Sequence, residues 1–270
     1  MVEIALRFWH KHSSVSVRTI TISAESHVGQ LREDNEDFFG VHEPVDEEDL
    51  RARGRLAVVC DGMGGGVCGL TASRLAVKIM IREYRDAPPE VSVEEALRRG
   101  LESANTEVFK AGIDNVRYRG MGTTATAIAV LEDEAYLAHV GDSRAYLVRD
   151  ESISQITDDH TLVNKLLRSG AITEEQARDH PQSHVITRCI GGRPRVEVDI
   201  IGPLALQTGD RFVLCSDGLY GQVNDDAILY AVCTHPPREA CQSLVEQAND
   251  SGGADNITVL ILSVEEEESD

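Results

Sequence analysis

Residues 56–69 read LAVVCDGMGGGVCG, and their order predicts the local fold. The apolar run at residues 56–60 is typical of a buried strand and is too short for a helix. Asp61 and a glycine-rich turn follow, and apolar residues then recur at helical spacing over residues 70–84. The stretch therefore predicts a strand, a loop and a helix, with a carboxylate where the strand ends.

The segments on both sides of this stretch add strands and helices. Residues 122–156 alternate short apolar runs with brief turns, and such short connections allow only antiparallel neighbours. Further elements are predicted at residues 93–110, 211–215, 225–232, 238–248 and 257–264. We therefore expect the α+β class, with two mainly antiparallel sheets packed face to face and helices outside.

Length and charge limit the function classes. The chain has 270 residues, 26 basic against 46 acidic side chains, and a net charge of −20. The length suits one large domain. The charge argues against a nucleic acid or an anionic membrane as partner, because both are bound through Lys and Arg. Since no apolar run is long enough to span a bilayer and no signal peptide is evident, we expect a cytoplasmic protein.

Aspartates recur where the predicted strands meet loops. They are Asp37, Asp61, Asp142, Asp217 and Asp255. A single Asp-Gly pair is most often a plain turn, but turns give no reason for aspartates to recur at the ends of the most apolar strands. Carboxylates gathered in this way repel one another unless a cation lies among them. Oxygen ligands of this kind suit Mg²⁺ or Mn²⁺, so the pattern predicts a metal site.

In these motifs the chain resembles the metal-dependent Ser/Thr protein phosphatases (the PPM family, type 2C) in their compact bacterial form. The motifs follow the family's order along nearly the whole chain. They are R-x-x-N-E-D at residues 32–37, DGMGG at 61–65, GTT at 122–124, GDSR at 141–144, SDGL at 216–219 and DNIT at 255–258.

The resemblance implies a four-layer α-β-β-α sandwich with a metal centre at one edge of the two sheets. We expect residues 19–264 to form a single phosphatase domain, with a flap at about 157–192. Residues 1–18 would be an N-terminal arm of unknown role, and residues 265–270 an acidic tail.

The resemblance also implies the ligands of two Mn²⁺ or Mg²⁺ ions. Asp61 should bridge the two ions, and the carbonyl of Gly62 should bind one of them. Asp217 and Asp255 should complete the first site, and Asp37 should serve the second through water.

Other roles follow from the same motifs. Asp142 and Asp217 would hold a third ion, bound more weakly than the other two. Arg32 should clamp the phosphate, and Glu36 and Asn256 would support the ligands from behind.

The implied reaction is hydrolysis of phosphoserine and phosphothreonine in proteins. A hydroxide that bridges the two ions would attack phosphorus in line. No cysteine nucleophile is needed, so Cys60 and Cys215 are interpreted as small buried apolar residues. We expect phosphorylated proteins as partners, together with a cognate Ser/Thr kinase pathway, and a monomeric enzyme.

Two alternatives remain open. Gly64, Gly66 and Gly69 spell G-x-G-x-x-G, a pattern of dinucleotide-binding enzymes, but Asp61 would lie beside the pyrophosphate and no second strand follows the helix. The other alternative is a catalytically weak or inactive regulatory module on the same fold. Aspartates at all five motif positions favour catalysis. Gly66 and Leu70 stand where many bacterial members have His and Glu, which leaves the loop near the metals less polar.

Overall fold

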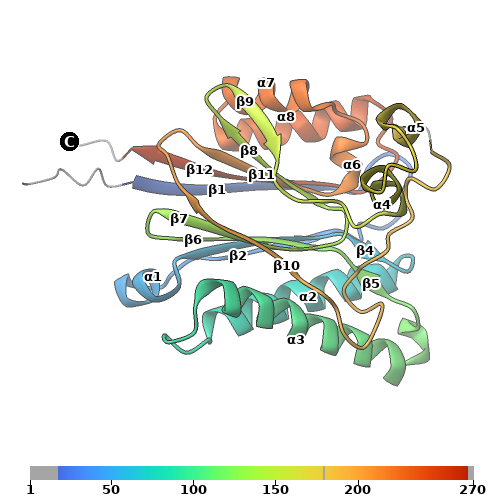
Figure 1. Ribbon diagram of the computed structural model, residues 1–270, viewed down its shortest axis with the longest axis horizontal. Helices are drawn as coiled ribbons and strands as arrows, with labels where there is room; N and C mark the ends of the chain where they lie inside the picture. Colours follow the sequence, from blue (N-terminus) through green and yellow to red (C-terminus); the bar gives the residue numbers. More distant parts are fainter. Residues whose placement is uncertain (1–17, 179, 267–270) are drawn as a thin grey trace, which may run out of the picture.

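Two five-stranded sheets form the centre of the structure, a computed structural model that describes residues 18–178 and 180–266 (Figure 1). The first sheet has the order β1-β12-β11-β8-β9 and the second β10-β7-β6-β3-β2, and all pairings in both are antiparallel. The strands of the first sheet are β1 (Arg18–His27), β8 (Arg144–Arg149), β9 (Ser152–Gln155), β11 (Arg211–Cys215) and β12 (Ile257–Glu266). Those of the second are β2 (Phe38–His42), β3 (Arg55–Cys60), β6 (Ala125–Leu131), β7 (Glu134–Val140) and β10 (Asp199–Ala205).

Helices cover the outer face of each sheet, which gives four layers (Figure 1). The second sheet packs on α2 (Val67–Arg85) and α3 (Val93–Asp114), and the first on α7 (Asp225–Thr234) and α8 (Pro237–Asp250). A third apolar cluster lies between the sheets. The predicted α-β-β-α sandwich is therefore confirmed.

The remaining elements are short. They are α1 (Glu47–Arg53), β4 (Gly62–Met63), the 3-10 turn η1 (Val116–Tyr118), β5 (Gly122–Thr123), α4 (Leu162–Arg168), α5 (Glu174–Arg178) and α6 (Asp217–Tyr220). Among the described residues, no helix combines the length and apolar character needed to cross a membrane.

Strand β3 shows why its sequence is apolar without a break. Leu56, Val58 and Cys60 lie in the cluster under α2 and α3. Ala57 and Val59 alternate with them and lie in the cluster between the sheets. Because both faces of this strand are buried after its first residue, Arg55, no position from 56 to 60 favours a polar side chain.

Several element boundaries differ from the sequence-based expectation. Helix α2 begins at Val67, three residues before the predicted start, because the glycine-rich turn is shorter than expected. Strand β12 runs through Glu265 and Glu266, so the first two residues of the expected acidic tail pair with β1. Arg18, assigned to the N-terminal arm, begins β1. The rest of the arm and tail, residues 1–17 and 267–270, lies outside the described residues.

The strand ends that carry the five aspartates meet at one end of the sandwich. Figure 1 shows β4, β5 and α6 at this end, opposite the start of β1 and the end of β12. The flap helices α4 and α5 lie at the same end (Figure 1). The topology thus places residues that are far apart in sequence around one site.

Candidate metal centre

Asp61 is held by the GTT motif of the neighbouring strand. Its N–H donates to Thr124 Oγ1 at 2.8 Å, and its carbonyl accepts from the Thr124 N–H at 2.8 Å. The same carbonyl accepts from Thr123 Oγ1 at 2.7 Å. A Cβ at Gly62 would stand 2.3 Å from the carbonyl oxygen of Gly69, so this position requires glycine. The backbone that presents the Asp61 carboxylate and the Gly62 carbonyl is therefore fixed on both sides.

Two carboxylate oxygens are buried without a hydrogen-bond partner among the described residues. They are Asp37 Oδ1 and Asp217 Oδ1. The other oxygen of Asp37, Oδ2, accepts from Ser216 Oγ at 2.6 Å. A buried anionic oxygen without a partner costs free energy, and a divalent cation is the natural group to satisfy it. These residues therefore fit a metal ion.

The five aspartates lie within one another's electrostatic field. Burial, together with the charges of Asp217 and Asp255, raises the pKa of Asp37 to about 7. Burial, followed by the charge of Asp217, raises the pKa of Asp142 to about 7. The pKa of Asp61 lies well above its usual range because of burial and the charges of the other four aspartates. The strand ends thus bring all five predicted ligands together.

The carboxylates alone do not complete a site. Within residues 18–178 and 180–266, no three His, Cys, Asp or Glu side chains are grouped so that they could hold a metal ion as they stand. Mg²⁺ and Mn²⁺ also accept carbonyl and water oxygens. The donor set would therefore have to include the Gly62 carbonyl and water.

Arg32 supplies a cation at the edge of this acidic cluster. Its Nη2 lies 2.6 Å from Asp255 Oδ2, and its side chain is 50% exposed. A guanidinium has five N–H donors, so one contact with Asp255 leaves donors for a phosphoryl group. This half-exposed position is compatible with the expected role of Arg32 as a phosphate clamp.

Asn256 ties the loop of Arg32 to strand β12. Its Oδ1 accepts from the Glu36 N–H at 2.8 Å, and its Nδ2 donates to the carbonyls of Val28 and Asp34, each at 2.9 Å. Its own N–H donates to Asp255 Oδ1 at 2.8 Å. Asn256 therefore orients one predicted ligand and fixes the loop between β1 and β2, as expected of a supporting residue.

Glu36 occupies the space that the glycine-rich loop leaves open. Its Oε1 accepts from the Gly66 N–H. A Cβ at Gly69 would come within 1.8 Å of its Oε2. The glycines of this loop therefore make room for the side chain of Glu36. Because the sheets are also antiparallel throughout, the dinucleotide-binding hypothesis is wrong.

Asp142 lies on the turn after β7 and lines a cavity of about 730 Å³. Asp217 and Tyr220 line the same cavity, and the flap contributes Asn164 and His184. Asp142 is 4% exposed, and its carbonyl accepts from Tyr220 Oη at 2.9 Å. The flap therefore forms one wall of the space beside the candidate metal centre.

Sequence reasoning missed the hydroxyl groups that hold the carboxylates. Ser216 Oγ donates to Asp37 and accepts from the Thr258 N–H at 2.9 Å. Thr124 Oγ1 lies 2.6 Å from Ser143 Oγ. Each of these residues stands inside a motif that was used only for its aspartate or glycine, and that placement was the available signal.

The comparisons with known proteins agree with this geometry. The family model described as protein phosphatase 2C matches residues 32–252. This chain belongs to that family. The predicted resemblance is thereby confirmed, and the match spans five of the six motifs that carried it; the sixth, DNIT at residues 255–258, follows the matched range.

Individual phosphatases are also similar to this chain in sequence and in structure. The protein phosphatase PhpP of Streptococcus pneumoniae is 37% identical over 252 residues, which cover 92% of this chain and 99% of that protein. The structure of the Streptococcus agalactiae serine/threonine phosphatase matches with a TM-score of 0.83 at 34% identity, over 92% of this chain and 100% of that one. The catalytic domain of PstP, solved in complex with two manganese ions, matches with a TM-score of 0.77 at 33% identity, over 93% and 100% of the two chains.

Proposed function

We propose that this protein hydrolyses phosphoserine and phosphothreonine in other proteins with two Mn²⁺ or Mg²⁺ ions. The observation that carries the proposal is a pair of buried carboxylate oxygens, Asp37 Oδ1 and Asp217 Oδ1, that have no hydrogen-bond partner within residues 18–178 and 180–266. Arg32 lies at the edge of the same cluster. Membership of the protein phosphatase 2C family supports the class of reaction.

Asp61, the Gly62 carbonyl, Asp217 and Asp255 are the proposed ligands of the two ions, with Asp37 acting through water. Asp142 with Asp217 is the proposed site of a weaker third ion. Bound ions would activate a water molecule as the nucleophile and offset the charge of the phosphate.

The side chains of this chain would prepare the site for that chemistry. Arg32 can take two phosphoryl oxygens through its planar donors and stabilise their charge in the transition state. The hydroxyls of Thr124 and Ser216 hold the Asp61 backbone and the Asp37 carboxylate in place. Burial raises the pKa of the Cys60 thiol, which disfavours a thiolate nucleophile there.

The proposal extends to the setting of the reaction. We expect substrates phosphorylated by a cognate Ser/Thr kinase, a monomer, and a location in the cytoplasm. We also expect residues 19–264 to act as one catalytic domain. Light scattering of the purified protein tests the monomer, and a dimer would contradict it.

Phosphate release from matched phosphoserine, phosphothreonine and phosphotyrosine peptides tests the proposed function. With Mn²⁺, the first two peptides should be hydrolysed faster than the third, and EDTA should stop the reaction. A folded protein with no Mn²⁺-dependent release from any peptide would favour the inactive regulatory module and overturn the proposal.

A further inference from the structure

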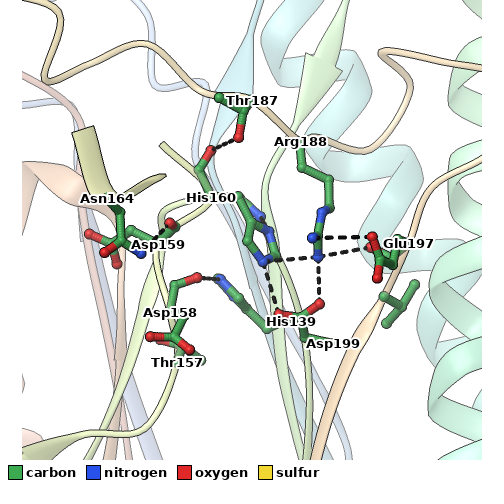
Figure 2. Close-up of polar contacts among 12 residues, drawn as sticks. His139, Thr157, Asp158, Asp159, His160, Asn164, Thr187, Arg188, Glu197 and Asp199 are labelled. Carbon is green, nitrogen blue, oxygen red and sulfur yellow. Dashed lines mark hydrogen bonds and ion pairs between the residues drawn. The ribbon is translucent and has the colours of Figure 1, made fainter. Parts of the chain in front are cut away.

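His160 lies at a point where four parts of the chain meet. It stands at the start of the flap and is 6% exposed. Its carbonyl accepts from the N–H of Thr187 at 2.7 Å and from Thr187 Oγ1 at 2.9 Å, so the two ends of the flap are joined here (Figure 2). Its N–H donates to the carbonyl of Gly141 at 2.7 Å, in the turn after β7. The flap is therefore fastened to the turn that carries Asp142.

The imidazole ring makes a second contact with the same turn. Its Nδ1 accepts from the N–H of Gly141 at 2.9 Å. A ring nitrogen that accepts this bond carries no hydrogen, so the neutral ring has its hydrogen on Nε2. Nε2 lies 3.0 Å from Asp199 Oδ2 and can donate to it. Both main-chain polar groups of Gly141 are thus bound by one residue.

Charged residues fix the outer side of the ring. Figure 2 shows the His160 ring beside Arg188, with Asp199 next to both. Arg188 Nη1 donates to Asp199 Oδ1 and so holds the carboxylate that accepts from His160 Nε2. Arg188 Nη2 lies 3.3 Å from Glu197. The ring of His139 packs against that of His160 with a centroid separation of 4.7 Å. These contacts leave the His160 ring little freedom to rotate.

The turn itself has a shape that few residues could adopt. Gly141 has φ of 118°, and a Cβ there would lie 2.6 Å from Thr124 Cβ. The next residue, Asp142, is held through its carbonyl by Tyr220. Because Gly141 has no side chain to hold it, its N–H and carbonyl are the groups through which neighbours can fix it.

The geometry points to His160 as a positioning residue for Asp142. By binding both polar groups of Gly141, it fixes the direction in which the adjacent carboxylate is presented. Because His160 also binds Thr187, it links this direction to the place where the two ends of the flap meet. This role rests on the proposed function, in which Asp142 is a ligand of the weaker third cation. Groups that orient metal ligands from behind typically contribute about 10–100-fold to metal affinity.

Two substitutions distinguish the contact of Nδ1 with Gly141 from the contact of Nε2 with Asp199. In His160→Asn the side-chain oxygen can take the place of Nδ1 and accept from Gly141. In His160→Gln the amide nitrogen can take the place of Nε2 and donate to Asp199, while the acceptor for Gly141 is lost. His180→Gln is the matched control, because this flap histidine bonds the N–H of Gln182 at 3.1 Å and no contact joins it to the turn in the described residues.

Hydrogen exchange at the Gly141 amide, measured without metal, tests the contact itself. In His160→Gln this amide should exchange at least about tenfold faster than in the wild type, since one hydrogen bond is lost. His160→Asn and His180→Gln should stay close to the wild type. Unchanged protection in a folded His160→Gln protein would overturn the inference. If His160→Gln does not fold, Asp199→Ala takes its place, because it keeps the ring but removes the acceptor for Nε2. Exchange at the Gly141 amide should be faster in this variant than in the wild type. An unchanged exchange rate would overturn the inference.

Calorimetric titration with Mn²⁺ tests the link to Asp142. His160→Gln should weaken the weakest class of sites about tenfold or more and leave the tighter sites unchanged. His160→Asn should restore most of this affinity. If Gly141 loses protection while Mn²⁺ binding stays as in the wild type, the positioning role is overturned although the contact exists. A wild type that binds no Mn²⁺ would overturn the proposed function and the link to the cation, whereas the exchange result would still stand for the contact.

Discussion

Individual carboxylate oxygens decide the character of this site. Ser216 satisfies one oxygen of Asp37 at 2.6 Å, whereas the other is buried without a partner in the described part of the chain. Asp217 presents a similar oxygen, and its pKa is raised by burial and by the charge of Asp255. A fold that only needed stability would gain from neutral groups at these positions. The residues are instead arranged for a cation.

Asp217→Asn should remove nearly all Mn²⁺-dependent phosphate release, because Asp217 is proposed to bind at two cation sites. We expect a loss on the order of 10²–10³-fold or more, the scale for losing one preorganised electrostatic group. The metal-free variant should unfold at a higher temperature than the wild type, since a buried repulsive charge is gone.

Activity assays and calorimetric unfolding in EDTA check both parts. Asp142→Ala is the informative comparison, since it should still bind the two tighter ions while turning over slowly. Equal losses of Mn²⁺ affinity in the two variants would contradict the assignment of Asp217 to both sites.

Elements differ in how far their sequences predict them. Strand β3 was predictable because it is buried on both faces from Leu56 to Cys60 and so is apolar over these residues. Strand β1 was missed although Ile20, Ile22 and Ala24 alternate toward the cluster between the sheets. Its partner β12 lies more than 200 residues away, as in the pair Arg18 and Glu266, and local patterns do not reveal such pairing.

Strand β10 was missed for a different reason. Its register shifts between Ile201 and Leu204, where Pro203 stands. An irregularity of this kind breaks the period-two alternation by which a strand is identified. The segment was therefore not separable from the flap that precedes it.

Gly69→Ala tests the packing of α2 against the site. Alanine normally favours a helix by about 1 kcal/mol over glycine. Here its Cβ would lie 1.8 Å from Glu36 Oε2 and 2.8 Å from the carbonyl carbon of Gly62. Overpacking costs about 1–3 kcal/mol, so we expect net destabilisation in urea and weaker Mn²⁺ binding.

Gly112→Ala is the matched control in α3, where the nearest atom to the added Cβ is 3.2 Å away. It should lie within about 1 kcal/mol of the wild type. Stabilisation by Gly69→Ala equal to that by Gly112→Ala would show that Glu36 does not need this space.

At the scale of the whole molecule, part of the net charge of −20 is concentrated at one place in the fold. Motifs spread from residue 32 to residue 258 deliver five aspartates to one end of the sandwich, opposite the start of β1 and the end of β12. The order of the motifs made the family predictable, and the expected ligands follow from the same motifs. The hydrogen bonds that fix those ligands, such as those between His160 and Gly141, depend on tertiary packing and were not predictable.

Stability of the metal-free protein should fall as pH rises from about 5 to 7. The pKa values of Asp37 and Asp142 are raised to about 7 in the fold, so the folded state binds more protons than the unfolded chain in this window. Burial lowers the pKa of His139 to about 3, which acts in the opposite direction below about pH 6.5. Burial also lowers the pKa of His160, which acts in the same direction as His139. The pKa values of four carboxyls are raised, since Asp61 and Asp217 share this shift with Asp37 and Asp142, so the carboxyls outnumber the two histidines.

Thermal unfolding in EDTA and in Mn²⁺ across this range measures the effect. Mn²⁺ should raise the unfolding temperature most at the upper end, where the carboxylates are ionised. A metal-free protein whose stability increases steadily from pH 5 to 7 would contradict the electrostatic account of the site.

The most direct test of the central claim is a Mn²⁺ titration of phosphate release from a phosphothreonine peptide by the wild type, Asp61→Asn and Asp114→Asn. Asp114 is an exposed residue at the end of α3 and controls for loss of one acidic charge. The wild type and Asp114→Asn should show the same Mn²⁺-dependent activity, and Asp61→Asn should show almost none at any Mn²⁺ concentration. Equal activity of all three proteins, or activity that persists in EDTA, would contradict a catalytic metal centre built on Asp61.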